Sequence, residues 1–141
     1  MPSAAFGATV ERVVDGDTFI ARRDGRSLRV RLIGVNAPES VKPGAPVECF
    51  GPESSRVLPD LLPVGARVRA AYEEGGQRDQ YGRELWDVWL ADGRFLQTVL
   101  VERGAAQARL YRPQPTYADL LAELGDQVQA QGKGLYGKCG S

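Results

Sequence analysis

The chain has 141 residues, a length typical of one domain and sufficient to bury a hydrophobic core. Its 18 basic and 18 acidic residues give a net charge of zero, so any polyanion must be held by a local arginine site rather than by overall charge. The sequence contains no histidine, which excludes histidine general bases, Ser/His and Cys/His nucleophile pairs and His-ligated zinc. Chemistry must therefore come from carboxylates, arginine, tyrosine, backbone groups and a hard metal ion.

Further features of the sequence indicate how many domains the chain has and whether it enters a membrane. No apolar run is long enough to span a bilayer, so we expect no membrane association. The first seven residues lack the basic start and apolar core of a signal peptide, although a removed signal leaves no trace. No internal repeat or long linker interrupts the chain. We therefore expect a single domain over residues 1–141 and a monomer.

The first part of the chain has the residue pattern of β-strands. Ala8–Val14 is rich in β-branched residues, and Thr18–Arg22 resumes the pattern after a turn. Asp24-Gly25 is a tight-hairpin signal, and Ser27–Val35 then alternates between apolar and basic side chains. These features predict three consecutive strands.

The remainder mixes helices with two more strands. Gly51-Pro52-Glu53 has the composition of a helix start, and Pro59 and Pro63 are expected to shorten or kink that helix. The other predicted elements are strands over Arg67–Tyr72 and Leu85–Leu90, a helix over Phe95–Arg103 ended by Gly104, and a last helix over Thr116–Gln131.

The order of these elements, β-β-β-α-β-β-α-α, indicates an α+β, mainly β fold. We expect a small antiparallel five-stranded barrel with three α-helices packed on it. The oligonucleotide/oligosaccharide-binding (OB) fold is the common five-stranded solution.

Charged residues are concentrated near the predicted strand ends. Asp15-Gly16-Asp17-Thr18 taken alone is typical of a turn with solvated acids, and Arg31 alone is typical of a solvated strand face. However, Asn36-Ala37-Pro38-Glu39 follows Arg31 closely, and Asp79-Gln80-Tyr81-Gly82-Arg83 precedes the fifth strand. It is this combination in order that points to a functional site.

With these motifs the chain resembles the staphylococcal-nuclease-like family, also called thermonucleases or micrococcal nucleases. The resemblance covers nearly the whole chain, and the ordered set of motifs is specific. The matching segments are Val14–Ile20, Arg31–Glu39, Glu48–Glu53, Tyr81–Leu85, Asp92–Gly104, Tyr111–Pro113 and the helix before Gly134-Leu135-Tyr136.

The resemblance implies a Ca²⁺-dependent phosphodiesterase that acts on DNA and RNA. It assigns Asp17, Asn36 and the backbone carbonyl of Ala37 to the metal, and Glu39 to orienting or deprotonating the attacking water. It assigns Arg31 and Arg83 to the scissile phosphate. The aromatic side chains that it places at the nucleotide site are Tyr81 and Tyr111.

The chemistry of these residue types agrees with the implied roles. Ca²⁺ binds hard oxygen ligands in flexible geometry, and carboxylate, amide and carbonyl oxygens all qualify. Hydrolysis of a phosphodiester increases the negative charge on the phosphate oxygens, which guanidinium groups bind in a bidentate manner. A carboxylate base needs no histidine, so the composition is compatible with this mechanism.

Three positions depart from the family pattern. The family commonly has Asp where this chain has Asn36, so we expect weaker Ca²⁺ binding without loss of the site. Ala37 replaces a residue whose backbone carbonyl is the ligand, and this change matters less. Position 109 is Arg rather than an aromatic residue, and the loop Val41–Val47 contains only one basic residue, so substrate binding is expected to differ.

Two alternatives to an enzyme are a non-catalytic nucleic-acid-binding OB module and a β-barrel interaction domain with accidental motif matches. The first should have lost Glu39 or one of the two arginines, and all three are present. The ordered motifs argue against the second.

The two cysteines, Cys49 and Cys139, are 90 positions apart, which is not the spacing of a zinc motif. They are either unrelated thiols or a disulfide worth about 4–5 kcal/mol on the loop-entropy model. In the resembling fold the C-terminal tail packs near the start of the first helix, and this favours the disulfide. A disulfide would indicate a secreted or periplasmic protein.

Overall fold

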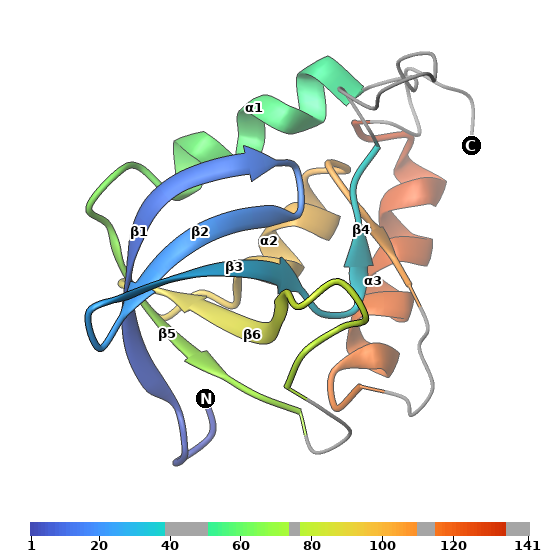
Figure 1. Ribbon diagram of the computed structural model, residues 1–141. Helices are drawn as coiled ribbons and strands as arrows, with labels where there is room; N and C mark the ends of the chain where they lie inside the picture. Colours follow the sequence, from blue (N-terminus) through green and yellow to red (C-terminus); the bar gives the residue numbers. More distant parts are fainter. Residues whose placement is uncertain (39–50, 74–76, 110–114, 135–141) are drawn as a thin grey trace.

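The computed structural model describes residues 1–38, 51–73, 77–109 and 115–134, and of residues 51–55 the backbone alone (Figure 1). Five strands close into a barrel in the order β1-β2-β3-β6-β5. The barrel strands are β1 (Phe6–Asp15), β2 (Thr18–Arg23), β3 (Arg26–Leu32), β5 (Arg67–Ala71) and β6 (Glu84–Leu90). The five predicted strands and the mainly β, OB-type architecture are confirmed.

The expectation of an all-antiparallel barrel is wrong, because β3 and β6 run parallel. The reason is geometric: neighbours in a closed ring of five strands cannot all alternate in direction, so at least one pair must be parallel. In this chain the parallel pair places Arg31 beside Leu85. The residues just before β6 are thereby brought near the C-terminal end of β3.

The β2–β3 hairpin turns at Asp24 and Gly25, as predicted. Both residues have positive φ, 52° and 77°, which suits the twist of a two-residue hairpin. The register of the hairpin pairs Thr18 with Arg31. The arginine near the end of β3 thus lies across from the start of β2.

The single strand predicted over Ser27–Val35 is instead broken. After β3 ends at Leu32 the chain turns, and a short strand β4 (Val35–Asn36) pairs with β7 (Gln107–Ala108) outside the barrel. Gly34 between them has φ 81°, and a Cβ atom there would lie 2.9 Å from Leu121 Cδ1. A glycine is therefore needed for both the backbone conformation and the close approach of the last helix.

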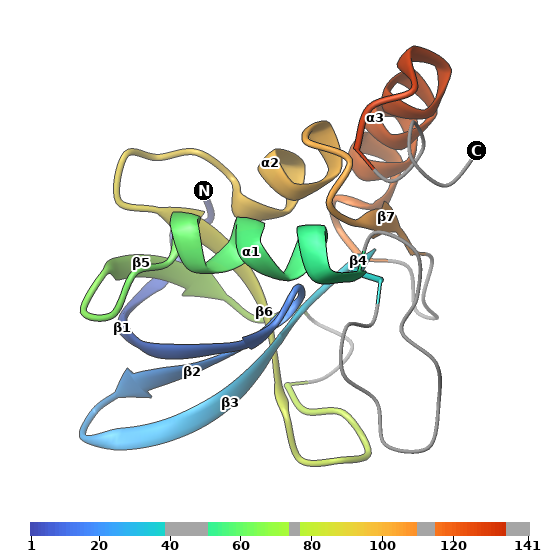
Figure 2. The same cartoon turned by 90° about the horizontal axis from the view of Figure 1, so that it is seen from above.

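Three helices accompany the barrel, as expected: α1 (Gly51–Leu61), α2 (Leu96–Glu102) and α3 (Ala118–Gln131). α1 continues through Pro59 and ends before Pro63. α2 is followed by Gly104 with φ 67°, which agrees with the predicted stop. α1 packs near β1, whereas α2 and α3 contact each other on the side away from the β2–β3 hairpin, with β4 and β7 between α3 and the barrel (Figure 2).

The core fills the barrel and continues beneath α2. Phe19 and Trp86 are fully buried and meet edge to face inside the barrel. The predicted apolar face of the fifth strand is confirmed, but the opposite face is buried as well, and Trp89 on that face contacts the rings of Phe95 and Tyr117. Asp87 on the same face is 3% exposed.

Candidate functional site

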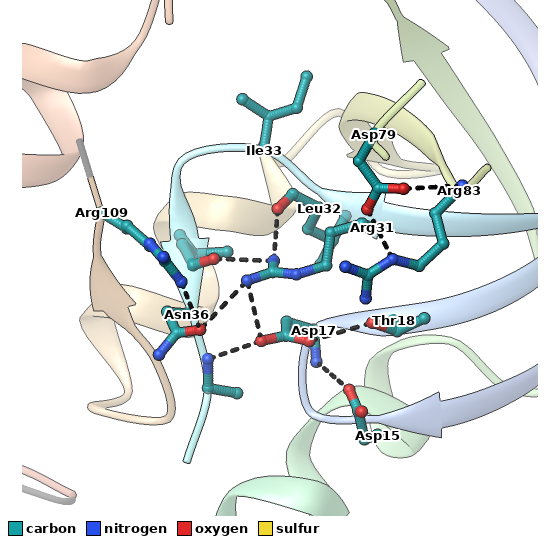
Figure 3. A network of polar contacts seen from close by, with 12 residues as sticks. Asp15, Asp17, Thr18, Arg31, Leu32, Ile33, Asn36, Asp79, Arg83 and Arg109 are labelled. Atoms are coloured by element: carbon teal, nitrogen blue, oxygen red, sulfur yellow. Dashed lines mark hydrogen bonds and ion pairs between the residues drawn. The ribbon is translucent and has the colours of Figure 1, made fainter. Parts of the chain in front are cut away.

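Asp17 lies in the tight turn between β1 and β2. Its backbone amide donates a hydrogen bond to Asp15 Oδ1 (3.2 Å), and its carbonyl accepts one from the amide of Leu32 (3.0 Å). The side chain is buried and is surrounded by donors, because the Thr18 hydroxyl donates to Oδ1 (3.1 Å) and the Ala37 amide donates to Oδ2 (2.8 Å) (Figure 3). The turn thus fixes one carboxylate at the end of the barrel.

Arg31 occupies the centre of the site. The residue is 7% exposed, and its Nη1 donates to the carbonyl oxygens of Leu32 (2.7 Å) and Val35 (2.8 Å). Its Nη2 lies 3.3 Å from Asp17 Oδ2 and donates to Asn36 Oδ1 (3.2 Å). A buried guanidinium is tolerated because it is hydrogen-bonded and faces a carboxylate. These contacts hold it in one orientation.

Asn36 reaches the site from β4. Its amide oxygen accepts from Arg31 Nη2 and, at 3.5 Å, from Arg109 Nη1. Both the Asn36 oxygen and the Asp17 Oδ2 atom therefore lie within 3.3 Å of one nitrogen of Arg31. A carboxylate and an amide oxygen that converge on one positive group form a donor set suited to a hard cation such as Ca²⁺.

Within the described residues no group of three or more Asp, Glu, Cys or His side chains could hold a metal ion. The donor set there consists of the Asp17 carboxylate, the Asn36 amide and backbone oxygens such as that of Ala37. Glu39, the further predicted carboxylate, lies outside the described residues. The residues present fit a hard cation by their chemistry, with a low count of negative charges.

Arg83 lies in the loop before β6, and Asp79 holds it. Asp79 Oδ2 accepts from Arg83 Nε at 2.7 Å, while Oδ1 accepts from the backbone amides of Arg83 and Tyr81, each at 2.9 Å. Burial tends to raise the pKa of Asp79, but the hydrogen bonds from Arg83 and Tyr81 and the charge of Arg83 outweigh it and lower the pKa. Asp79 is therefore a carboxylate that fixes both the loop and the guanidinium.

The predicted site residues are only partly brought together by the described structure. Asp17, Arg31, Asn36 and Ala37 form one connected network, and Arg83 approaches from the loop before the neighbouring strand (Figure 3). Tyr81 is 75% exposed, and its ring centroid lies 5.5 Å from the Arg83 guanidinium carbon. The predicted residues that lie outside the described part of the chain are Glu39, Tyr111, Cys49 and Cys139.

Sequence reasoning missed two contacts. Asp79 was not singled out as a partner of Arg83, although an Asp that accepts hydrogen bonds from backbone amides a few residues later is a common turn pattern. The contact between Arg109 and Asn36 joins residues that are far apart in the sequence. Only the replacement of an aromatic residue at position 109 hinted at it.

Comparison with known proteins places these motifs in a family. The model of the family described as "Staphylococcal nuclease homologue" matches residues 29–138. The chain is 43% identical to the thermonuclease of Staphylococcus intermedius over 126 residues, which is 89% of this chain and 72% of the relative. The chain belongs to the staphylococcal nuclease homologue family. Further relatives are the thermonuclease of Staphylococcus hyicus (38% identical, 90% of this chain and 73% of the relative) and endonuclease YncB of Bacillus subtilis (30%, 94% and 62%).

Membership of the staphylococcal nuclease homologue family confirms the resemblance inferred from the motifs. The family match contains Arg31, Asn36, Ala37 and Arg83, while Asp17 precedes its first residue. None of the described helices is long and apolar enough to cross a membrane.

Proposed function

We propose that the protein is a Ca²⁺-dependent phosphodiesterase that hydrolyses DNA and RNA. Relatives named thermonuclease and endonuclease support nuclease activity. The observation that carries the proposal is the buried Arg31 guanidinium, held by two carbonyl oxygens and by Asp17, with Arg83 next to the neighbouring strand.

In the proposed mechanism the arginines bind the scissile phosphate. The oxygens around phosphorus gain negative charge as water attacks, and donors already fixed in place stabilise that charge without reorganising. Arg31 is oriented by Leu32, Val35 and Asp17, and Arg83 is oriented through its Nε atom by Asp79. This last contact leaves the terminal nitrogens of Arg83 directed away from Asp79, as a phosphate ligand requires.

Asp17, Asn36 and the Ala37 carbonyl are proposed to hold the Ca²⁺ ion. A bound ion would supply positive charge beside the scissile phosphate and would increase the acidity of nearby water. Glu39 is proposed to accept the proton of the attacking water, and Tyr81 and Tyr111 to contact the nucleotide. These assignments extend the motif matches to the residues of this chain.

We also propose that the protein is monomeric and exported, and that Cys49 and Cys139 form a disulfide. Mass spectrometry under non-reducing conditions tests the disulfide, since a bridged protein is two hydrogen masses lighter than the dithiol form. Detection of two free thiols in protein from an oxidising compartment would contradict it.

The principal experiment is degradation of single-stranded DNA and of RNA with Ca²⁺ and with a chelator. We expect hydrolysis in Ca²⁺ and none in chelator. Activity that persists unchanged in chelator, or binding of nucleic acid with no cleavage in Ca²⁺, overturns the proposal. The second result would identify a non-catalytic binding module instead.

A further inference from the structure

Arg109 is a third guanidinium group at the site that neither the family motifs nor the proposed mechanism uses. It follows β7, and its backbone amide donates to the carbonyl of Gly34 at 2.8 Å. The two residues before it pair with β4, which carries Asn36. The backbone of Arg109 is thus fixed relative to the site, while its side chain is exposed.

Asn36 connects this side chain to Arg31. Its amide oxygen accepts from Arg31 Nη2 at 3.2 Å and from Arg109 Nη1 at 3.5 Å, so the two nitrogens are no farther apart than the sum of these contacts. An amide oxygen has two lone pairs and can accept both bonds. Because the amide is neutral, it contacts both arginines without cancelling their charge. A carboxylate at this position would cancel part of that charge.

In the view of Figure 3 the guanidinium groups of Arg83 and Arg109 lie on opposite sides of that of Arg31, above the turn that carries Asp17. A row of positive groups matches a row of phosphates along one nucleic-acid strand. Since the whole chain has no net positive charge, such local contacts must supply the attraction for a polyanion.

We propose that Arg109 binds a second phosphate of a single-stranded substrate, next to the scissile phosphate held by Arg31 and Arg83. The proposal rests on the proposed function for the identity of the scissile position. Arg109 then determines a preference for substrates with at least two consecutive phosphates. The neutral side chain of Asn36 is part of the same arrangement, because an amide does not cancel the positive charge of Arg109 as a carboxylate would.

The test compares two substrates. One is a thymidine dinucleotide with a single phosphodiester and no other phosphate, and the other is an oligothymidylate of about eight nucleotides, within the site size of an OB fold. Arg109→Gln should raise KM for the oligonucleotide roughly tenfold, the loss of one charge-assisted contact, with kcat nearly unchanged. It should leave kcat/KM for the dinucleotide within about twofold, because that substrate lacks the second phosphate.

Salt dependence gives a second readout that a structural role would not produce. The slope of log KM against log salt concentration for the oligonucleotide should become shallower by about 0.7, the value for one phosphate contact on a single strand. Arg109→Lys should restore most of that slope. Arg67→Gln is the matched control, because Arg67 is exposed at the start of β5 and its replacement makes the same change in net charge; it should alter neither KM nor slope.

Three outcomes overturn the inference. Equal losses on both substrates would place Arg109 at the scissile phosphate or make it a support of Asn36. Unchanged kinetics of Arg109→Gln on both substrates would show that Arg109 does not contact the substrate. Effects of Arg67→Gln equal to those of Arg109→Gln would show that only the net charge matters.

The inference can be separated from the proposed function. If the wild-type protein cleaves neither substrate in Ca²⁺, the proposed function fails. Fluorescence anisotropy with a labelled oligothymidylate then still tests Arg109. Weaker binding by Arg109→Gln with a shallower salt slope supports the second phosphate contact, and identical binding overturns it.

Discussion

Two buried carboxyl groups in the same barrel have opposite kinds of partners. Asp17, at the site, is 6% exposed and is surrounded by the Thr18 hydroxyl, the Ala37 amide and the Arg31 guanidinium. Asp87, on β6, is 3% exposed and interacts with a second carboxyl group, that of Glu73. Burial, together with the hydrogen bond to Glu73 and its negative charge, raises the pKa of Asp87 to about 9.

The two acids differ in the partners that surround them. The Thr18 hydroxyl and the Ala37 amide donate to Asp17, and the Arg31 guanidinium lies 3.3 Å from it. Asp87 instead keeps its proton and shares a hydrogen bond with Glu73, which accepts from the backbone amide and hydroxyl of Thr116, each at 2.8 Å. The first arrangement holds a carboxyl group beside Arg31, and the second ties the segment before α3 to the barrel.

Replacing Arg31, the cation beside Asp17, should have the largest effect on activity and stability. Arg31→Gln should lower kcat by about 10³-fold, because a fixed donor to the developing phosphate charge is lost. It should also lower the free energy of unfolding by about 3–5 kcal/mol, since Asp17 remains buried without its cation. Single-turnover kinetics and urea unfolding measure the two effects.

Arg31→Lys is the matched variant, because it retains the charge but not the planar fork. It should recover much of the stability and little of the activity. Near wild-type turnover in either variant would remove Arg31 from the catalytic residues.

Replacing Asp87 should abolish a pH dependence of the free energy of unfolding. Asp87 holds its proton in the fold up to about pH 9, whereas the unfolded group has a pKa of 3.8. Between these values the folded state binds one more proton than the unfolded state, so stability falls as pH rises, by up to about 1.4 kcal/mol per pH unit. This stabilisation is fully present below the unfolded pKa and is lost as pH rises through the folded pKa.

Asp87→Asn keeps a donor toward Glu73 and cannot ionise. Urea unfolding at pH 5 and pH 8 should show a loss of stability in the wild-type protein that exceeds the loss in the variant by up to about 4 kcal/mol. Asp126→Asn, at an exposed position of α3, should behave as the wild-type protein does. Parallel pH profiles for Asp87→Asn and wild type would show that the carboxyl is ionised in the fold.

The sequence predicted the parts of this comparison that depend on local pattern. Turn chemistry predicted the hairpin at Asp24-Gly25, and alternation predicted the strand positions. The ordered motifs selected Asp17 and Arg31 as candidate site residues. The pairing of β4 with β7 was not predictable, because each strand has two residues and no periodicity.

The Asp87–Glu73 pair was missed for a related reason. Asp87 lies within an apolar strand whose alternation predicts a solvent-facing position, but the side chain is buried and interacts with Glu73, on a face where Trp89 contacts the ring of Tyr117. Contacts that form between distant segments leave no local signal. The same holds for Asn36 and Arg109, which meet across the β4–β7 sheet.

Loss of the contact that orients Arg83 should perturb the site less than loss of Arg31. Asp79→Asn keeps an oxygen for the backbone amides of Tyr81 and Arg83 but loses the charged contact to Arg83 Nε. We expect kcat/KM to fall about tenfold with an unchanged circular dichroism spectrum, because the guanidinium is no longer held in position.

A matched control is available in the turn before α2. Asp92 accepts from the amide and Nε of Arg94 in the same manner, at 3.1 and 2.8 Å, on an exposed turn. Asp92→Asn should leave kcat/KM unchanged. Equal losses in the two variants would indicate a general effect on the turns instead of a role for Asp79 at the site.

The last expected effect, similar in size to that of Asp79→Asn, concerns the negative charge that residue 36 lacks. Asn36→Asp should tighten Ca²⁺ binding about tenfold in calorimetry, because affinity rises with the number of charged ligands. The structure also sets a limit on this gain, since Arg31 and Arg109 both contact the side-chain oxygen and would form ion pairs with a carboxylate. Combining Asn36→Asp with Arg109→Gln removes one competing cation and should bind Ca²⁺ more tightly than Asn36→Asp alone. Unchanged affinity in the single and double variants would mean that residue 36 does not bind the metal, and its amide would then serve only to position the two arginines.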